Sequence, residues 1–293
     1  MTSHDVRPAA VAGLFYPGDA AALAGEVDRL LQGALSGSAP SGSAPSGSAS
    51  TGGALSGSAS TAGALPRALI VPHAGYVYSG PIAASAYALL RDAAPRVHRV
   101  VLLGPAHFVP LHGLALPDAA SLETPLGRVP VDLDAAARAA SLPEVTSSAT
   151  AHAREHSLEV QLPFLQRLLP GVPVVPLVVG RAKPEAVARV LEALWDEPGT
   201  LVLVSSDLSH YLPWEVARGV DGDTARRIVA LDERIESEEA CGSAGIRGLL
   251  VAAKRRGLSA RQLDLRNSGD TAGDKRRVVG YGAFAFEAPA GTA

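Results

Sequence analysis

Apolar residues follow two different spacings along the chain, and the two spacings alternate. Unbroken apolar runs, typical of strands buried on both faces of a sheet, predict strands at 68–71, 99–103, 172–179 and 200–205. Between these runs, apolar residues recur at helical spacing, which predicts helices at 82–90, 132–141 and 184–195. Strands that alternate with helices favour an α/β fold. We therefore expect a single domain with a mainly parallel central sheet flanked by helices.

The remaining segments complete this pattern. Asp19 suits the N-cap of a helix that continues to about Leu31. Pro81 suits the first turn of the helix at 82–90, because proline lacks the backbone N–H that a first turn leaves unpaired. Further predicted elements are a short strand at 113–117, a hairpin at 123–130, helices at 154–165, 221–230 and 242–256, and closing strands at 263–265 and 278–286.

One stretch interrupts the pattern. From about 33 to 65 the chain consists almost entirely of Gly, Ser, Ala, Pro and Thr, and it contains the near-repeat Ser-Gly-Ser-Ala-Pro. Such a composition buries too little apolar surface to offset the entropy lost on ordering the chain. We expect a flexible surface insert that interrupts one domain spanning residues 1–293, and we assign it no chemistry.

Three of the predicted strands run into a histidine. The first is followed by His73, the second by His107, and the last by the sequence Ser-Ser-Asp-Leu-Ser-His, which ends at His210. The carboxyl ends of parallel strands meet at one edge of a sheet, where ligands usually bind. A lone histidine after a strand is more often an ordinary loop residue. Three at equivalent positions favour a shared site.

The only cysteine of the chain, Cys241, adds a candidate metal ligand. Imidazole and thiolate are good ligands for iron, copper or zinc, whereas magnesium and calcium prefer oxygen. Cys241 precedes Gly242 at the start of a predicted helix, where the dipole lowers the pKa of a thiol. The alternative is a small buried hydrophobe. As a ligand, Cys241 would form a three-ligand site with His73 and His107. Such a site leaves coordination positions of the metal open, as in catalytic metal centres.

Other polar residues allow several roles. Asp207 and His210 share one short loop, so one could be a ligand or a general base and the other its orienting partner. A serine hydrolase is disfavoured because the chain has no Gly-x-Ser-x-Gly elbow. His156 and Glu159 would share a helical face, although an ordinary solvated helix start is an equal alternative. The histidines without an accompanying motif are expected on the surface: His4, His98, His112 and His152.

Charge and composition exclude several classes of protein. The 293 residues include 26 basic and 29 acidic ones, for a formal charge of −3, and no basic cluster stands out. Nucleic acids and anionic membranes are therefore not expected as partners. A single cysteine excludes an internal disulfide and fits a reducing compartment. Because the chain has neither a signal-like N-terminus nor an apolar run of about 18 residues, we expect a soluble cytoplasmic protein.

Five ordered motifs closely resemble those of the Memo family. They are Pro-His-Ala-Gly-Tyr at 72–76, Leu-Gly-Pro-Ala-His at 103–107, Glu-His-Ser-Leu-Glu-Val-Gln-Leu-Pro-Phe at 155–164, Ser-Ser-Asp-Leu-Ser-His at 205–210 and Cys-Gly at 241–242. The resemblance runs from about Arg7 to Phe286, apart from the insert. The bacterial and archaeal members of this family are called AmmeMemoRadiSam system protein B.

The resemblance implies a fold similar to that of the class III extradiol dioxygenases, which open catechol-like rings at a nonhaem iron. It implies a metal held by His73, His107 and Cys241, with His210 and the adjacent Asp207 as catalytic residues. In the dioxygenases the third ligand is a carboxylate, so a cysteine there alters the usual triad. Further pocket residues expected from the same motifs are His156, Glu159 and Tyr76.

Two positions depart from the family pattern. Phe108 stands where many relatives have a second histidine, and residues 243–245 lack a histidine that some relatives carry after Cys-Gly. The expected ligand set survives both changes.

The leading functional expectation is a metal-binding, redox-active protein that uses iron or copper in a dioxygenase-like pocket. The alternative is a noncatalytic binding or scaffold member of the same fold. A third hypothesis, metal-assisted hydrolysis, requires a carboxylate ligand, and only Asp207 and Glu159 are available. The resemblance also implies two protein partners, a radical-SAM protein and an AMMECR-type protein of the same system.

Overall fold

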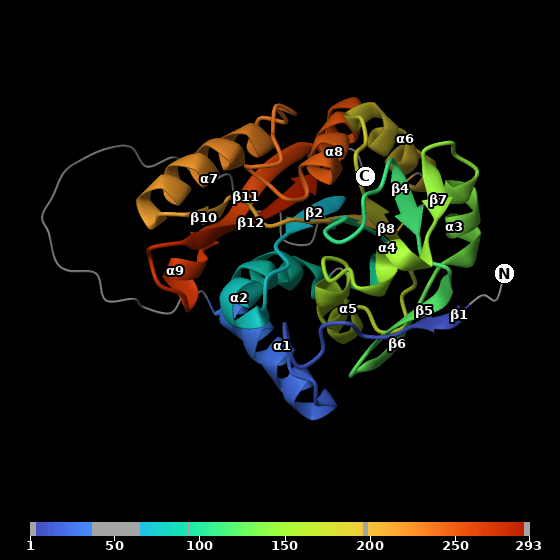
Figure 1. Cartoon of the computed structure of the whole chain (residues 1–293), viewed down its shortest axis with the longest axis horizontal. Coiled ribbons are helices and arrows are strands. Elements are labelled where there is room, and N and C mark those ends of the chain that lie inside the picture. The colour runs from blue at the N-terminus through green and yellow to red at the C-terminus, as the bar shows by residue number, and fades with distance from the viewer. Residues whose placement is uncertain (1–3, 37–64, 93, 196–198, 290–293) are drawn as a thin grey trace, which may run out of the picture.

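The computed structural model describes residues 4–36, 65–92, 94–195 and 199–289, so most of the predicted insert lies outside the described residues. The main sheet has nine strands, in the order β10-β12-β2-β9-β3-β8-β4-β7, with β11 paired to β12 (Figure 1). Their bounds are β2 Ala68–Val71, β3 Arg99–Pro105, β4 Leu114–Leu116, β7 Val145–Ser147, β8 Val174–Val179, β9 Thr200–Ser205, β10 His210–Leu212, β11 Ser259–Asn267 and β12 Val278–Glu287.

The centre of this sheet is parallel and fully buried. Strands β2, β9, β3 and β8 run in the same direction, and antiparallel neighbours, β12 and β4, continue the sheet on either side. In β2, Ala68 and Ile70 pack into one core while Leu69 and Val71 pack into the other, which explains the unbroken apolar run. The expected α/β domain with flanking helices is confirmed. The sheet is mixed because β12 and β4 run antiparallel to the central strands.

Helices cover both faces of the sheet (Figure 1). The core on one face includes α1, α2 and α5, and the core on the other includes α3, α6, α7 and α8. The helices are α1 Ala20–Leu35, α2 Tyr76–Tyr87, α3 Leu133–Ala140, α4 Ala149–Ala153, α5 Leu162–Leu168, α6 Pro184–Trp195, α7 Trp214–Val229, α8 Ser243–Arg255 and α9 Ser268–Thr271, with 3₁₀ turns η1 Ala88–Leu90, η2 Ala94–Arg96 and η3 Glu159–Gln161.

Three predicted helix starts are wrong. The helix expected from residue 221 is α7, which begins at Trp214. Helix α2 begins at Tyr76 rather than at Pro81, because the Gly75 carbonyl already accepts hydrogen bonds from the N–H groups of Tyr78 and Ser79. Pro81 therefore lies inside the helix. The segment at 154–165 is not one helix either, since it contains a loop before η3 and α5. Asp19 does cap α1, accepting a hydrogen bond from the Ala22 N–H at 2.9 Å.

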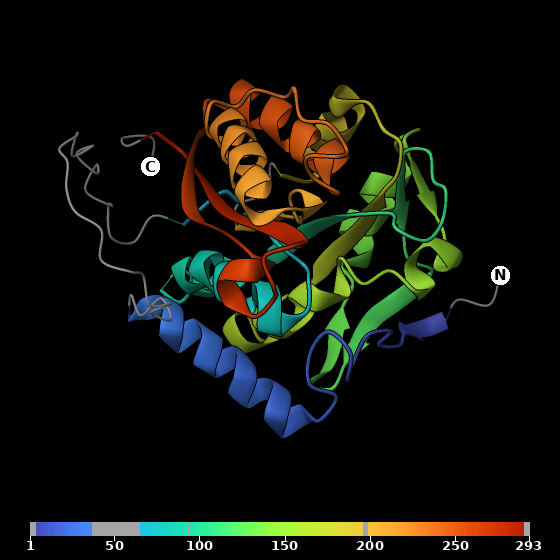
Figure 2. The ribbon, with the colours of Figure 1, turned by 60° about the vertical axis from the view of Figure 1, so that its left-hand side comes forward.

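The N-terminal arm is fastened to the domain by a buried ion pair. Strand β1 (His4–Arg7) pairs with β5 (Ala119–Thr124), which pairs with β6 (Gly127–Pro130) in a separate three-stranded sheet (Figure 2). At its end, Arg7 pairs with Glu159, and both side chains are buried. The same carboxylate accepts hydrogen bonds from the Ala10 and Val11 N–H groups and from the Tyr16 hydroxyl. The arm thereby braces the segment that leads into η3.

Among the described residues, none of the helices combines the length and the apolar character needed to cross a membrane.

Candidate metal centre

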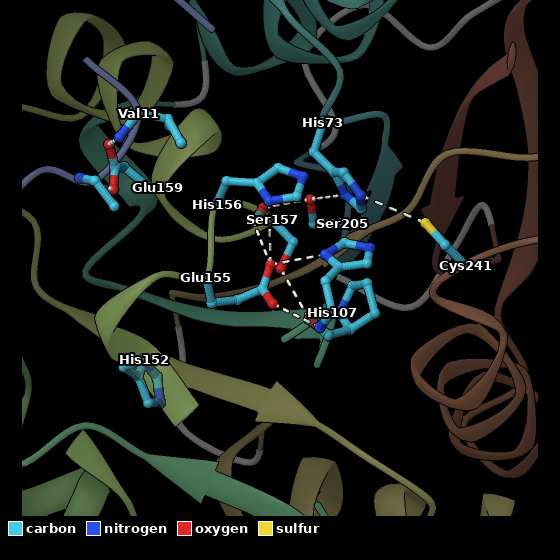
Figure 3. A network of polar contacts seen from close by, with 12 residues as sticks. Val11, His73, His107, His152, Glu155, His156, Ser157, Glu159, Ser205 and Cys241 are labelled. Atoms are coloured by element: carbon cyan, nitrogen blue, oxygen red, sulfur yellow. Dashed lines mark hydrogen bonds and ion pairs between the residues drawn. The ribbon is translucent and has the colours of Figure 1, made fainter. Parts of the chain in front are cut away.

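The strand order brings the histidine loops together. Strand β9 lies between β2 and β3, so the loops after these three parallel strands are neighbours at one edge of the sheet. His73 follows β2 and His107 follows β3, while His156 comes from the loop before η3. One ring nitrogen from each of these histidines lies within 4.8 Å of the others. Figure 3 shows the three side chains facing one another, with Cys241 approaching from the side of α8.

Hydrogen bonds fix the orientation of His73. The Ser205 hydroxyl donates its proton to the Ser157 carbonyl at 2.6 Å and accepts a hydrogen bond from Gln161 Nε2 at 2.8 Å. The same hydroxyl oxygen lies 2.9 Å from His73 Nδ1. Because its one proton is already donated to Ser157, it accepts a hydrogen bond from the Nδ1–H group. Burial above all, together with the neighbouring His107, lowers the pKa of His73 well below its ordinary value. The ring is therefore neutral, and Nε2 keeps a free lone pair.

A carboxylate orients His107 in the same way. Glu155 Oε1 lies 2.8 Å from His107 Nδ1, and Oε2 accepts the His107 backbone N–H at 2.7 Å. Burial opposes a charge on Glu155, but these bonds and one from the Ser157 N–H together lower its pKa to about 2. The carboxylate can only accept, so Nδ1 donates and Nε2 is the nitrogen left for a metal.

His156 is placed differently from the other two histidines. Its ring stacks on His107 with centroids 4.7 Å apart, and Phe15 and Phe108 lie at 4.6 and 5.9 Å. Burial lowers its pKa to about 4, so the ring is neutral. Its Nδ1 is 3.7 Å from Glu155 Oε1, which is beyond a normal hydrogen bond. Among the described residues, no hydrogen bond fixes the tautomer of His156.

Cys241 lies beside His73, with its sulphur 3.4 Å from Nε2. Two ligands of one metal ion, with bonds of about 2.1 and 2.3 Å, lie roughly 3.1 to 3.6 Å apart, so this separation already suits a shared ion. The expectation of a lowered thiol pKa is wrong. Burial above all, with a contribution from the charge of Asp207, raises the pKa of Cys241 to about 12, and this outweighs the start of α8.

Asp207 and His210 lie at the edge of the histidine cluster. Asp207 Oδ1 accepts the His73 backbone N–H at 2.7 Å, so this buried carboxylate organises the His73 loop. Burial raises its pKa to about 7 although hydrogen bonds from that loop favour the charged form. His210 is half-buried at the start of β10, and burial above all lowers its pKa. The next residue, Tyr211, has φ 59° in the left-handed region.

Three polar residues lie in surroundings that differ from those expected from the sequence. Glu159 does not share a face with His156, because its carboxylate holds the N-terminal arm. Tyr76 is buried, and its hydroxyl donates to the Val160 carbonyl at 2.8 Å inside the core. The expectation that His152 lies on the surface is wrong. It is buried beneath β4, where Nε2 lies 2.8 Å from the Ala115 carbonyl, and burial lowers its pKa to about 4. His98 and His112 are exposed, as expected.

A pocket of about 790 Å³ opens over the centre. Its walls come from the segment after β3, the end of β8, and the first turn of α8, and they include His107 and Cys241. Pockets of this size hold small-molecule ligands.

The donor set fits a transition metal. It offers imidazole nitrogens from three histidines and a thiol. Two of the imidazoles are fixed by hydrogen bonds on the other side of the ring, and the thiol contacts one of these two. Such donors suit iron, copper or zinc and not calcium or magnesium. The ligands are oriented by Glu155, Ser205 and Gln161. These residues lie within the sequence motifs, but nothing in the sequence indicated that they orient the ligands. Their roles depend on contacts between distant segments.

Comparison with known proteins identifies the family. The family model described as Memo-like protein matches residues 7–285. The chain belongs to the Memo-like protein family. A MEMO1 family protein of Metallosphaera sedula is 35% identical to this Memo-like chain over 296 residues, which cover 96% of the chain and 99% of the relative. Another, from Ignicoccus hospitalis, is 36% identical over 300 residues, covering 97% and 99%.

A solved structure has the same kind of fold. The crystal structure of an uncharacterized protein from Escherichia coli matches with a TM-score of 0.51 and 17% sequence identity, covering 74% of the Memo-like chain and 98% of the other. At this identity the likeness concerns the fold alone, and it agrees with the α/β architecture of the Memo-like chain.

Proposed function

We propose that this Memo-like protein is a redox-active metal protein that holds iron or copper with His73, His107 and Cys241. One observation carries the proposal: both histidines have Nδ1 committed to an orienting acceptor, and Nε2 of His73 lies 3.4 Å from a thiol. Metal-binding histidines in proteins are oriented in this manner. A bound iron or copper ion would supply one-electron redox chemistry.

The surrounding residues have distinct parts in this proposal. Ser205 and Glu155 hold the two imidazoles in the tautomer that leaves Nε2 free. Phe15 and Phe108 flank His156 and limit the access of water to that side. His210, outside the three-histidine cluster but electrostatically coupled to it, is the group that takes or gives a proton, and Asp207 keeps the His73 loop in place.

We also propose a more specific membership within the Memo-like family. The five motifs support a member of the AmmeMemoRadiSam system, with a radical-SAM protein and an AMMECR-type protein as cytoplasmic partners. They support a likeness to the class III extradiol dioxygenases in the position of the two histidines. A thiol in place of the third carboxylate gives the metal a softer donor than the dioxygenase triad has, so thiols are tested as substrates beside catechols.

The experiment starts from protein purified without a histidine tag. Elemental analysis is expected to find close to one iron or copper ion per chain, with an electron paramagnetic resonance signal that changes when Cys241 is replaced by serine. Oxygen consumption is then measured with catechols and with thiols. The matched control is His98→Gln, which removes an exposed histidine that belongs neither to the cluster nor to the lining of the pocket. Protein that takes up no transition metal under these conditions contradicts the proposal.

A second candidate function is noncatalytic binding in the same pocket. The observation that favours it is the degree to which Asp207, Glu155 and Ser205 are already engaged in hydrogen bonds that hold loops and rings. If the metal-loaded protein consumes no oxygen with any substrate tested yet binds a ligand in the pocket, this function replaces the first.

A further inference from the structure

The pocket over the candidate metal centre is lined by two arginines whose side chains have no partner among the described residues. The charged side chains that line it, besides histidine, are Arg181, Arg247 and Glu236. Arg181 follows β8 on one wall, and Arg247 lies one turn into α8 on another. Within the described part of the chain, neither guanidinium makes a hydrogen bond or an ion pair. Most other arginines of this protein pair with a nearby carboxylate, as Arg255 does with Glu192.

Arg247 is the more informative of the two. Its Nε atom is buried and has no hydrogen-bond partner in the described structure, although the side chain as a whole is only partly buried. Because Nε has almost no accessible surface, an anion in the pocket would meet the terminal nitrogens of this guanidinium, for which the described residues provide no acceptor. Ser243 and Ala244 lie four and three positions earlier on α8, and they line the pocket too.

The start of α8 adds donors at the same wall. Gly242 is the N-cap of this helix of 13 residues, and no side-chain hydrogen bond caps the helix there. Within the described chain, the backbone N–H groups of Ala244 and Gly245 donate no hydrogen bond, and both residues line the pocket. These groups and the positive end of the helix dipole favour a negatively charged group beside Arg247.

We propose that this part of the pocket, which we call the arginine subsite (Arg181, Arg247 and the N–H groups of Ala244 and Gly245), binds an oxyanion group of the substrate. The group is a carboxylate or a phosphate, since both accept the forked donors of arginine. The rest of the ligand then extends toward His107 and Cys241, which line the same pocket. The inference rests on the proposed function only in naming this ligand as the substrate. The anion site itself does not require the metal.

Glu236 sets a limit on the charge of the ligand. It is exposed and lies on the pocket wall formed by the segment before Cys241. Its carboxylate opposes an anion, so two cations and one anion leave a modest positive excess at the pocket. The subsite therefore suits one singly or doubly charged group and not a polyanion.

The test measures anion binding to metal-free protein, prepared with a chelator, in a buffer without other oxyanions. Isothermal titration calorimetry with inorganic phosphate and, separately, with acetate is expected to show saturable binding of at least one, and the tighter probe identifies the group. Arg247→Met is expected to weaken that binding about tenfold or more. Arg255→Met, on the same helix but paired with Glu192, serves as the matched control and is expected to bind like the unchanged protein.

Two further variants keep the test independent of the folding of Arg247→Met. Glu236→Gln removes the opposing charge from an exposed position, so it is expected to tighten anion binding severalfold, and Arg181→Met is expected to weaken it. Three outcomes overturn the proposal: neither phosphate nor acetate binds saturably, Arg247→Met binds the anion as tightly as Arg255→Met does, or Glu236→Gln binds it more weakly than the unchanged protein. Metal content, measured on the same variants, is expected to stay unchanged, so failure of the anion site is separable from failure of the metal site.

Discussion

Ser205 Oγ lies 2.9 Å from His73 Nδ1, and this contact determines which nitrogen of His73 faces the site. The hydroxyl has a single proton, which it donates to the Ser157 carbonyl, so toward the ring it can only accept. Gln161 fixes the hydroxyl in turn, since its Nε2 donates to Ser205 while its Oε1 accepts from the Tyr87 hydroxyl. A chain of buried hydrogen bonds thus leads from the core to the lone pair of a candidate ligand.

Replacing Ser205 by alanine is expected to weaken metal binding about 10- to 100-fold, because His73 can then adopt either tautomer. Two buried groups, Gln161 Nε2 and the Ser157 carbonyl, each lose a partner, so we also expect a loss of about 1–3 kcal/mol in the free energy of unfolding. Competition titration with a chromogenic chelator measures the affinity, and urea unfolding measures the stability.

Thr200→Val is the matched control for Ser205→Ala. Thr200 lies at the opposite end of β9, is buried, and has a hydroxyl with no partner among the described residues. Its replacement is expected to leave metal affinity unchanged. Equal affinity in both variants would show that Ser205 does not govern His73.

Glu159→Gln is expected to destabilise the fold by about 3–5 kcal/mol, because it leaves the Arg7 guanidinium buried without a counter-charge. Glu26→Gln is the control, since its partner Arg29 is mostly exposed and such pairs contribute about 0.2–1 kcal/mol. Urea unfolding of both variants gives the comparison. Similar losses in the two would mean that the buried pair fastens the N-terminal arm no better than a surface pair does.

The elements of the fold were predictable where one physical signal dominated. Strands β2 and β9 were predicted to the residue, because a strand buried on both faces must be apolar at every position. Helix α6 was also predicted to the residue, since its proline start and apolar face agree. The start of α2 was not predicted correctly. Proline favours the first turn of a helix, but here the Gly75 carbonyl accepts hydrogen bonds from two N–H groups and starts the helix before Pro81.

The sequence predicted the candidate ligands of the site but not the residues that orient them. Strand ends and residue type sufficed to group His73 with His107. The position of His156 in that cluster depends on a loop held by Glu155, and the burial of Glu159 depends on an arm some 150 positions away in the sequence. Cys241 shows the opposing effects most directly. Its place at a helix start favours a low pKa, but the burial that raises the pKa is decided by the packing of α8 against the loop after β9.

Cys241→Ser is expected to lower metal affinity at least about tenfold without unfolding the chain, because a hydroxyl is nearly isosteric with a thiol but a far poorer ligand. His156→Gln is expected to have the smaller effect, since no hydrogen bond orients its ring as Ser205 and Glu155 orient those of His73 and His107. Chelator competition and the absorption spectrum of the metal-loaded variants provide the measurement. The reverse order of effects would make His156 the third ligand in place of Cys241.

His210→Ala is expected to separate catalysis from metal binding. His73, His107 and Cys241 already provide three donors, and His210 stands outside the cluster of His73, His107 and His156. Its loss should therefore leave metal content close to that of the unchanged protein. As a general acid or base it would contribute about 10²–10⁴ in rate, so turnover in the best oxygen-consuming reaction should fall by that factor.

The control for His210→Ala is Tyr211→Ala, which alters the next residue of the same strand, β10. Tyr211 is 62% exposed and its ring contacts that of His210, so the variant tests whether a disturbed strand alone lowers the rate. A rate loss confined to His210→Ala, together with full metal content in both variants, supports the proton-transfer role. If His210→Ala instead changes only ligand affinity by about 1 kcal/mol, as expected for one lost hydrogen bond, the pocket is a binding site and the catalytic assignment of His210 is wrong.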